Sequence, residues 1–209
     1  MLRNPVKRLW SAFTYGYRLN GVPHLLHTLR NKDRTFHFPC AATVPRTCEV
    51  SLLEYLNFSH PAAHKPMIAN CQTKMLAGHY CGKPMDVTAG VLGSALRLLS
   101  QRNVWFGLTD RWDDSMKLFE AEVGLIDMAQ ADENTRPTST TGRGLASTGE
   151  YFHQTYGSKP TAEQEALIEQ YENFDMILYK KAVEIFEARL RKYNHAKDTR
   201  SVGMDNTSS

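Results

Sequence analysis

Three polar side chains at the start of the chain have the types and spacing to bind a phosphate group. Asn4 and Pro5 suit the cap and the first position of a helix, and Arg3 lies directly before them. Arg8 and Ser11 are three residues apart, so on a helix they share one face. Guanidinium and hydroxyl groups donate hydrogen bonds to phosphate oxygens. The pattern predicts that Arg3, Arg8 and Ser11 bind a phosphate; the alternative is an amphipathic helix with surface arginines.

Residues 3–13, Arg-Asn-Pro-x-x-Arg-x-x-Ser-x-Phe, resemble the 3′-phosphate-binding motif of carbohydrate sulfotransferases. In that family the first Arg and the Ser hold the 3′-phosphate of the sulfate donor, 3′-phosphoadenosine 5′-phosphosulfate. These two residues correspond to Arg3 and Ser11. Three further stretches resemble segments of the same family, in the same order along the chain: residues 70–78, 104–116 and 173–179. The resemblance implies a P-loop-like α/β sulfotransferase domain that moves sulfate to a hydroxyl group of a carbohydrate.

The resemblance also implies contacts with the acceptor sugar. Residues 70–78 resemble a family segment that lies near the nucleotide and acceptor cleft. The resemblance therefore implies that Asn70, Gln72 and Lys74 bind the substrate. Arg136 belongs to a stretch that resembles a loop near the same cleft. The alternatives are that Lys74 is an exposed helix charge and that Arg136 lies in a solvated basic loop.

The family's catalytic half precedes its Arg-x-Pro motif, and in this sequence nothing precedes that motif. The Lys-containing phosphate loop for the 5′-phosphosulfate and the general base lie there in relatives, so no catalytic base is assigned. We expect an N-terminally truncated sulfotransferase domain over residues 1–195, mostly helical with few strands, followed by a disordered polar tail over 196–209. The alternative function is a non-catalytic remnant or a helical binding module of the same descent.

Composition limits the classes of molecule that the chain is expected to bind and its expected place in the cell. A formal net charge of +3 is small for a nucleic-acid-binding protein, and no run of about 18 apolar residues predicts a membrane span. The resemblance implies a sulfated or uronic-acid-containing polysaccharide as acceptor, and the Golgi lumen as location. The family needs no metal. Five possible zinc ligands do not have the spacing of a zinc ribbon or knuckle: His60, His64, Cys71, His79 and Cys81.

Four cysteines allow two disulfides in three connectivities. The short loops Cys40–Cys48 and Cys71–Cys81 give the simplest pairing; the alternative is four buried thiols. Two glycosylation sequons, at Asn57 and Asn206, favour an oxidising lumen.

Hydrophobic periodicity and capping signals predict the elements that position these residues. One strand is expected, over residues 104–109, and one long loop, over 132–149. Thr161 and Gln164 form a capping box that opens a helix. The other helices are expected over residues 4–19, 48–56, 74–79, 86–101, 113–124 and 175–193.

Overall fold

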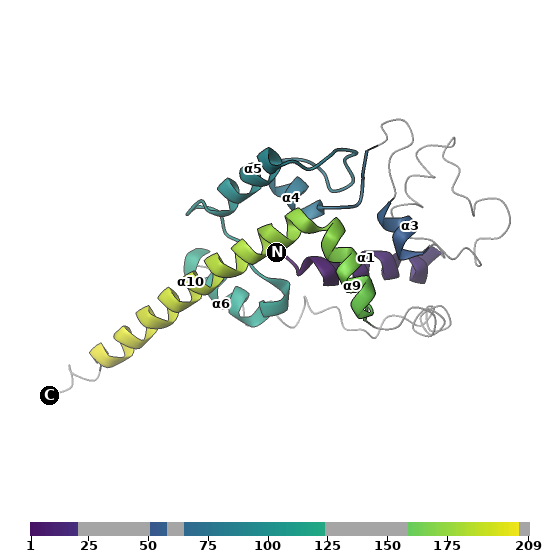
Figure 1. Ribbon diagram of the computed structural model, residues 1–209. Helices are drawn as coiled ribbons and strands as arrows, with labels where there is room; N and C mark the ends of the chain where they lie inside the picture. Colours follow the sequence, from purple (N-terminus) through teal and green to yellow (C-terminus); the bar gives the residue numbers. More distant parts are fainter. Residues whose placement is uncertain (21–50, 58–64, 124–158, 205–209) are drawn as a thin grey trace.

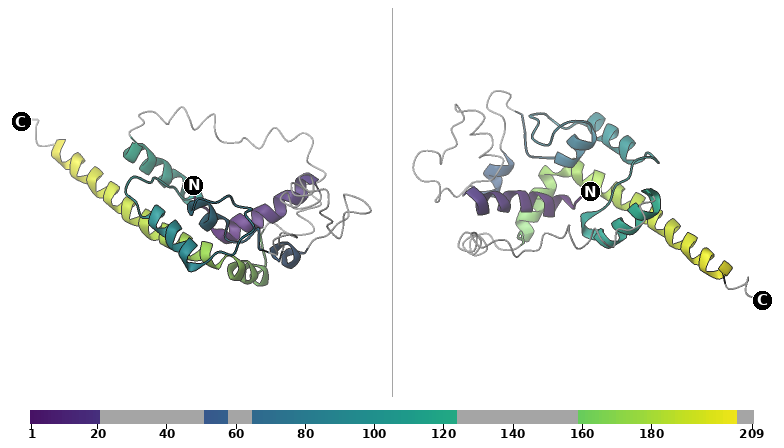
Figure 2. Two further views of the ribbon diagram at one scale, coloured as in Figure 1. Left: turned by 90° about the horizontal axis from the view of Figure 1, so that it is seen from above. Right: turned by 180° about the vertical axis from the view of Figure 1, so that it is seen from behind.

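The computed structural model describes residues 1–20, 51–57, 65–123 and 159–204 (Figure 1). The helices of this part of the chain pack mainly along the first half of one long helix, whose C-terminal half extends away from the others (Figures 1 and 2). They are α1 (Pro5–Asn20), α3 (Leu52–Leu56), α4 (Cys71–Leu76), α5 (Ala89–Leu99), the 3₁₀ helix η1 (Thr109–Arg111), α6 (Trp112–Val123), α9 (Ala162–Tyr171) and the long α10 (Asn173–Met204).

The expectation of a mostly helical chain with few strands is confirmed for the described residues. The strand predicted over residues 104–109 is wrong: only Leu2 and Leu108 form an isolated parallel bridge. Leu2 donates to the Gly107 carbonyl at 2.7 Å, and Thr109 donates to the Leu2 carbonyl at 2.8 Å. The pairing is short because α1 begins at Pro5 and η1 at Thr109. The apolar side chains of this segment are buried by helices instead of by a sheet.

The C-terminal helix is longer than predicted. Helix α10 continues to Met204, whereas residues 196–204 were expected to begin a disordered tail. Residues 173–202 contain neither proline nor glycine, and the first glycine is Gly203. The sequence therefore has no strong signal to end the helix before that residue. Residues 205–209 lie outside the described residues.

Polar side chains cap the N-termini of α1, α9 and α3, and the sequence analysis identified two of these caps. The Asn4 side chain accepts from the backbone N–H of Lys7 at 3.1 Å and caps α1. Thr161 and Gln164 form the predicted capping box at α9. A second box, which the sequence analysis did not identify, joins Ser51 and Glu54 at α3.

The hydrophobic core has two parts. One lies between α1, α3 and α9, with Leu9, Phe13 and Ile168 completely buried. The other lies between α5, α6 and α10, and also contains both residues of the bridge, Leu2 and Leu108. Helix α1 and the residues just before it therefore contribute to both parts.

Cys71 and Cys81 form a disulfide, which confirms that half of the predicted pairing. Cys40 and Cys48 lie outside the described residues, as does the predicted loop over 132–149. No helix of the described part is long and apolar enough to cross a membrane.

Ser115 joins η1, α6 and the bridge segment. Its completely buried hydroxyl accepts from the Leu108 N–H at 2.9 Å. It also lies within donating distance of the carbonyls of Leu108 (3.0 Å) and Arg111 (2.8 Å). We predict that Ser115→Ala lowers the free energy of unfolding by about 1–3 kcal/mol, because the Leu108 N–H loses its partner. Urea unfolding measures the change. The exposed Ser100→Ala is the control, and equal effects of the two variants would contradict the prediction.

Candidate functional site

A group of buried polar side chains lies where α1, α4 and α10 meet. Three of its members lie in α4 or directly before it, two lie between α9 and α10 or in the first turn of α10, and one projects from α1. Each of the first five is 7% exposed or less, although polar groups of this size are seldom buried without partners. The group, which we call the junction, consists of Asn70, Gln72, Lys74, Glu172, Asp175 and Arg8.

Helices α4 and α10 cap each other across the junction. The Asp175 carboxylate accepts from the backbone N–H groups of Gln72 at 2.9 Å and Thr73 at 2.7 Å. In return, the Asn70 side-chain oxygen accepts from the N–H groups of Phe174 at 3.0 Å and Asp175 at 3.1 Å. The first N–H groups of a helix have no partner within that helix. Each helix therefore supplies the cap that the other lacks.

Asn70 adopts the backbone conformation that this exchange requires. Its φ of 56° lies in the left-handed region, and no other described residue except glycine has a positive φ. Asparagine tolerates this region better than most residues. Its side-chain nitrogen also donates to the Tyr171 carbonyl at 3.1 Å, which fixes the amide in place.

Arg8 brings a positive charge to the two buried carboxylates. Its Nη2 lies 2.5 Å from Glu172 Oε2 and 3.6 Å from Asp175 Oδ2. Burial raises the pKa of Glu172 to about 8, although Arg8 opposes that change. Burial alone would lower the pKa of Arg8. The negative charges of Glu172 and Asp175 have the larger effect, so the pKa of Arg8 is raised. Arg8 therefore stays charged and anchors α1 to the start of α10.

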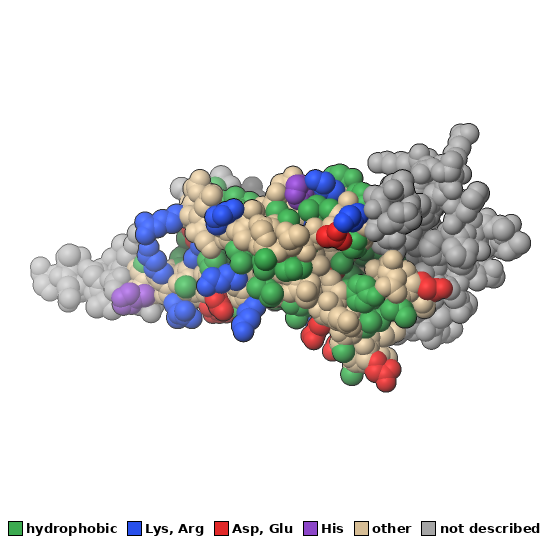
Figure 3. All heavy atoms as spheres, turned by 45° about the horizontal axis from the view of Figure 1, so that its top comes forward, with side chains coloured by type: hydrophobic (Ala, Val, Ile, Leu, Met, Phe, Trp, Pro, Cys, Tyr) green, Lys and Arg blue, Asp and Glu red, His purple; other side chains and the backbone are tan. Residues whose placement is uncertain are grey.

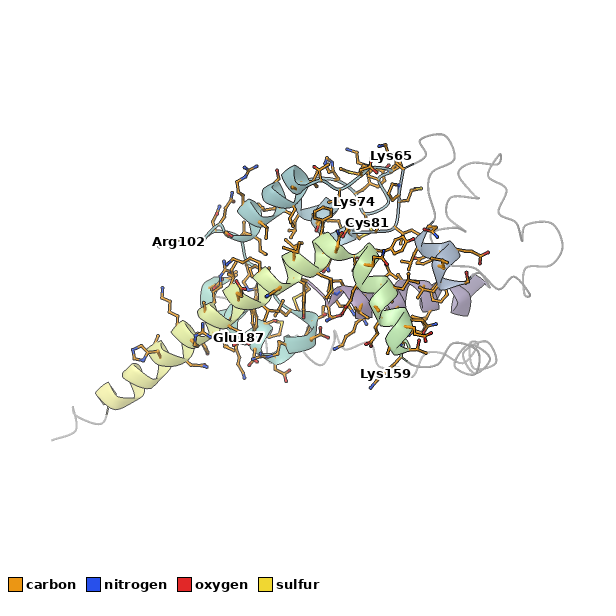
Figure 4. The ribbon with its side chains drawn as sticks, viewed as in Figure 1. Lys65, Lys74, Cys81, Arg102, Lys159 and Glu187 are labelled. Carbon is orange, nitrogen blue, oxygen red and sulfur yellow. A yellow bond between two sulfur atoms is a disulfide. The ribbon has the colours of Figure 1, made fainter. Side chains whose placement is uncertain are left out.

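Lys74 is completely buried in α4 beside the disulfide loop (Figure 4). Its Nζ donates to the carbonyls of Met67 at 3.2 Å and Lys83 at 3.1 Å, and lies 3.4 Å from that of Pro66. Burial lowers the pKa of Lys74 to about 8, opposed by Glu172 and Asp175. The interpretation of Lys74 as an exposed helix charge is wrong. Its ammonium group holds together the segments that precede and follow α4.

The Gln72 side chain binds the backbone of Arg3 in both directions. Arg3 N–H donates to Gln72 Oε1 at 2.8 Å, and Gln72 Nε2 donates to the Arg3 carbonyl at 2.9 Å. The amide thus binds the backbone of the residue that follows Leu2 of the Leu2–Leu108 bridge. Like Asn70 and Lys74, Gln72 has its polar side-chain atoms engaged in hydrogen bonds within the protein.

The three predicted phosphate ligands differ in whether the protein already occupies their side chains. The Arg3 side chain is exposed, and its guanidinium has no hydrogen bond or ion pair with any residue that the structure describes. Ser11 is half-buried on α1, and no described residue accepts from or donates to its hydroxyl. Arg8, by contrast, is committed to Glu172 and Asp175. Arg136 lies outside the described residues.

Sequence reasoning missed the carboxylates that organise the junction. Asp175 was noted only as part of a family-like stretch, and Glu172 was not noted. A signal was present: the two acids are three residues apart, next to Ile168 and Leu178 of the apolar stripe. Acids on the buried side of a helix need a cation or N–H donors. Their partners are more than 90 residues away in the chain, which no local pattern identifies.

Of the residues weighed for zinc, Cys71 and Cys81 form the disulfide, and His60 and His64 lie outside the described residues. The described part of the chain contains no group of three or more metal-ligating side chains.

Comparisons with known proteins assign no family to the chain. No family model, no curated protein and no solved structure matches it. The sulfotransferase resemblance thus depends on the four stretches quoted above.

We predict that Arg8→Met lowers the free energy of unfolding by about 3–5 kcal/mol, because it leaves Glu172 and Asp175 buried without their cation. Lys7→Met is the matched control: Lys7 is the next residue, its side chain is 60% exposed, and it pairs with Asp110. That exposed pair contributes about 0–1 kcal/mol. Chemical denaturation of both variants gives the comparison, and similar losses would contradict the assigned role of Arg8.

Glu172 makes the stability depend on pH. Because its pKa is raised to about 8 in the folded protein, the folded state keeps a proton that the unfolded chain releases above its ordinary pKa of about 4.3. The free energy of unfolding should therefore fall as the pH rises from 5 to 8. Denaturation across this range should show a smaller slope for Glu172→Gln. An unchanged slope in that variant would contradict the prediction.

Proposed function

We propose that this chain is part of a carbohydrate sulfotransferase domain, and that Arg3 and Ser11 bind the 3′-phosphate of 3′-phosphoadenosine 5′-phosphosulfate. The observation that carries the proposal is that the four family-like stretches meet in space. The stretch that begins at Arg3 is bonded to the second through Gln72 and to the fourth through Asp175. Leu108 of the third stretch pairs with Leu2, the residue just before the first stretch. Four separate resemblances thus form one structural unit.

The surroundings of Arg3 suit a dianionic phosphate. Arg3 is exposed and lies two residues before the first residue of α1, and the dipole of a helix favours negative charge at its N-terminus. The half-buried hydroxyl of Ser11 lies two turns further along the same helix. Arg8, assigned to the phosphate from the sequence, acts in this proposal by positioning α1 through the junction, because its charge is already balanced there.

The remaining parts of the proposal come from the family resemblance. The acceptor is a hydroxyl group of a sulfated or uronic-acid-containing polysaccharide, the reaction needs no metal, and the location is the Golgi lumen. The Cys71–Cys81 disulfide supports an oxidising compartment. We assign no catalytic base, and Asn70, Gln72 and Lys74 serve the fold rather than the acceptor.

One observation favours a second candidate, a non-catalytic module that binds the nucleotide. Three of the four residues that the resemblance places near the acceptor, Asn70, Gln72 and Lys74, are buried and engaged. Both candidates require the phosphate site, and a transfer assay with radiolabelled donor separates them.

Binding of 3′-phosphoadenosine 5′-phosphate, measured by isothermal titration calorimetry, tests the phosphate site. We expect Arg3→Ala to weaken binding by about ten-fold or more, because a charge-assisted bidentate contact is lost. Ser11→Ala should weaken it by about three- to ten-fold, the loss of one hydrogen bond. The matched control is Arg97→Ala, which removes an exposed cation of α5 and should leave the affinity unchanged.

Two results would contradict the proposal: no binding of the nucleotide to the wild-type protein, or binding that neither Arg3→Ala nor Ser11→Ala weakens. Circular dichroism of each variant confirms that the helices persist.

A further inference from the structure

A groove of about 650 Å³ lies between the C-terminal end of α6, the turn after α5, and α10. Its volume is typical of small-ligand sites. Arg189, one of its lining residues, follows Asp175 by 14 residues in α10, which places it about 21 Å further along the helix axis. The groove is therefore separate from the junction. The family-like stretches assign it no function.

Positive charge dominates this groove. Three cations and one carboxylate line it: Arg102, Arg189, Lys192 and Glu122. In Figure 3, Lys and Arg side chains gather over the end of α5 and the C-terminal half of α10, whereas most Asp and Glu side chains in view lie toward the other end. The groove thus lies in the basic part of the described surface.

The cations of the groove differ in how firmly they are held. Arg189 donates to the Val104 carbonyl at 3.1 Å, stacks on the Phe106 ring, and pairs with Glu122 at 3.6 Å. It forms a fixed wall. Arg102, at the turn after α5 in Figure 4, and Lys192 are exposed and have no ion pair with the described residues. These two charges are available to a ligand.

We propose that this groove binds the anionic groups, sulfate esters or carboxylates, of the acceptor polysaccharide, and so holds the polymer at a distance from the reacting hydroxyl. This inference rests on the proposed function. Arg102 and Lys192 pair with the anions, and the exposed Asn103 bonds to sugar oxygens. The groove is too small for a nucleic-acid duplex. A single strand needs open aromatic faces, but Trp105 packs against Phe119 with ring centroids 4.8 Å apart, and Tyr193 is half-buried.

Calorimetry with a heparin hexasaccharide at physiological salt tests the groove. The double variant Arg102→Ala/Lys192→Ala should bind at least about ten-fold more weakly, because two charge-assisted contacts are lost. The control Lys180→Ala/Lys181→Ala removes two exposed cations of α10 that do not line the groove. It should change the affinity less than two-fold.

Equal weakening by the two double variants would overturn the inference, because binding would then depend on charge in general. So would no binding of the hexasaccharide by the wild-type protein, or equal affinity for a single-stranded DNA hexamer. Titration with 3′-phosphoadenosine 5′-phosphate separates this inference from the proposed function. If the nucleotide binds through Arg3 and the hexasaccharide does not bind, only the groove assignment fails. If the hexasaccharide binds through the groove and the nucleotide does not bind, the donor site fails, and with it the acceptor role.

Discussion

The structure depends on an exchange of caps between two helices that are far apart in the chain. Asp175, in the first turn of α10, accepts from the first N–H groups of α4, and Asn70, just before α4, accepts from those of α10. Neither helix end would be satisfied in the interior without the other. Because Arg8 and Gln72 join the same group of residues, the exchange also fixes α1 and the bridge at Leu2. The two parts of the hydrophobic core are therefore held in one arrangement by polar contacts.

The junction brings two basic side chains, Arg8 and Lys74, together with two acidic ones, Glu172 and Asp175, all with little or no exposure. Because burial raises the pKa of Glu172 to about 8, hydrogen bonds as well as charge hold this group together. Removal of one member leaves an uncompensated charge in the interior, whereas the intact set also specifies which helices meet. This explains why residues with polar side chains occupy positions that packing alone would give to apolar ones. It also explains how a motif suggestive of ligand binding can serve the fold.

The sequence predicted the local features well and the long-range ones poorly. The start of α1 at Pro5, the capping box at Thr161 and the Cys71–Cys81 disulfide each depend on residues close together in the chain. The strand over residues 104–109 was wrong because an apolar run does not reveal whether a sheet or helices will bury it. Arg3 and Ser11 remain predicted phosphate ligands, and no described residue forms a hydrogen bond or ion pair with their side chains. Lys74 was misjudged because its carbonyl partners come from segments on both sides of α4.

The proposed donor site and the proposed polysaccharide groove both require that α1 and α10 keep fixed positions, which the exchange of caps provides. Native-state hydrogen exchange of the Asn70→Ala variant tests this claim most directly. The variant removes the acceptor of the Phe174 and Asp175 amides and the donor to the Tyr171 carbonyl, but none of the direct partners of the Gln72 and Thr73 amides. The account predicts faster exchange at Gln72 and Thr73 as well, because their acceptor, Asp175, loses its position. Faster exchange at Phe174 and Asp175 alone, with Gln72 and Thr73 unchanged, would contradict it.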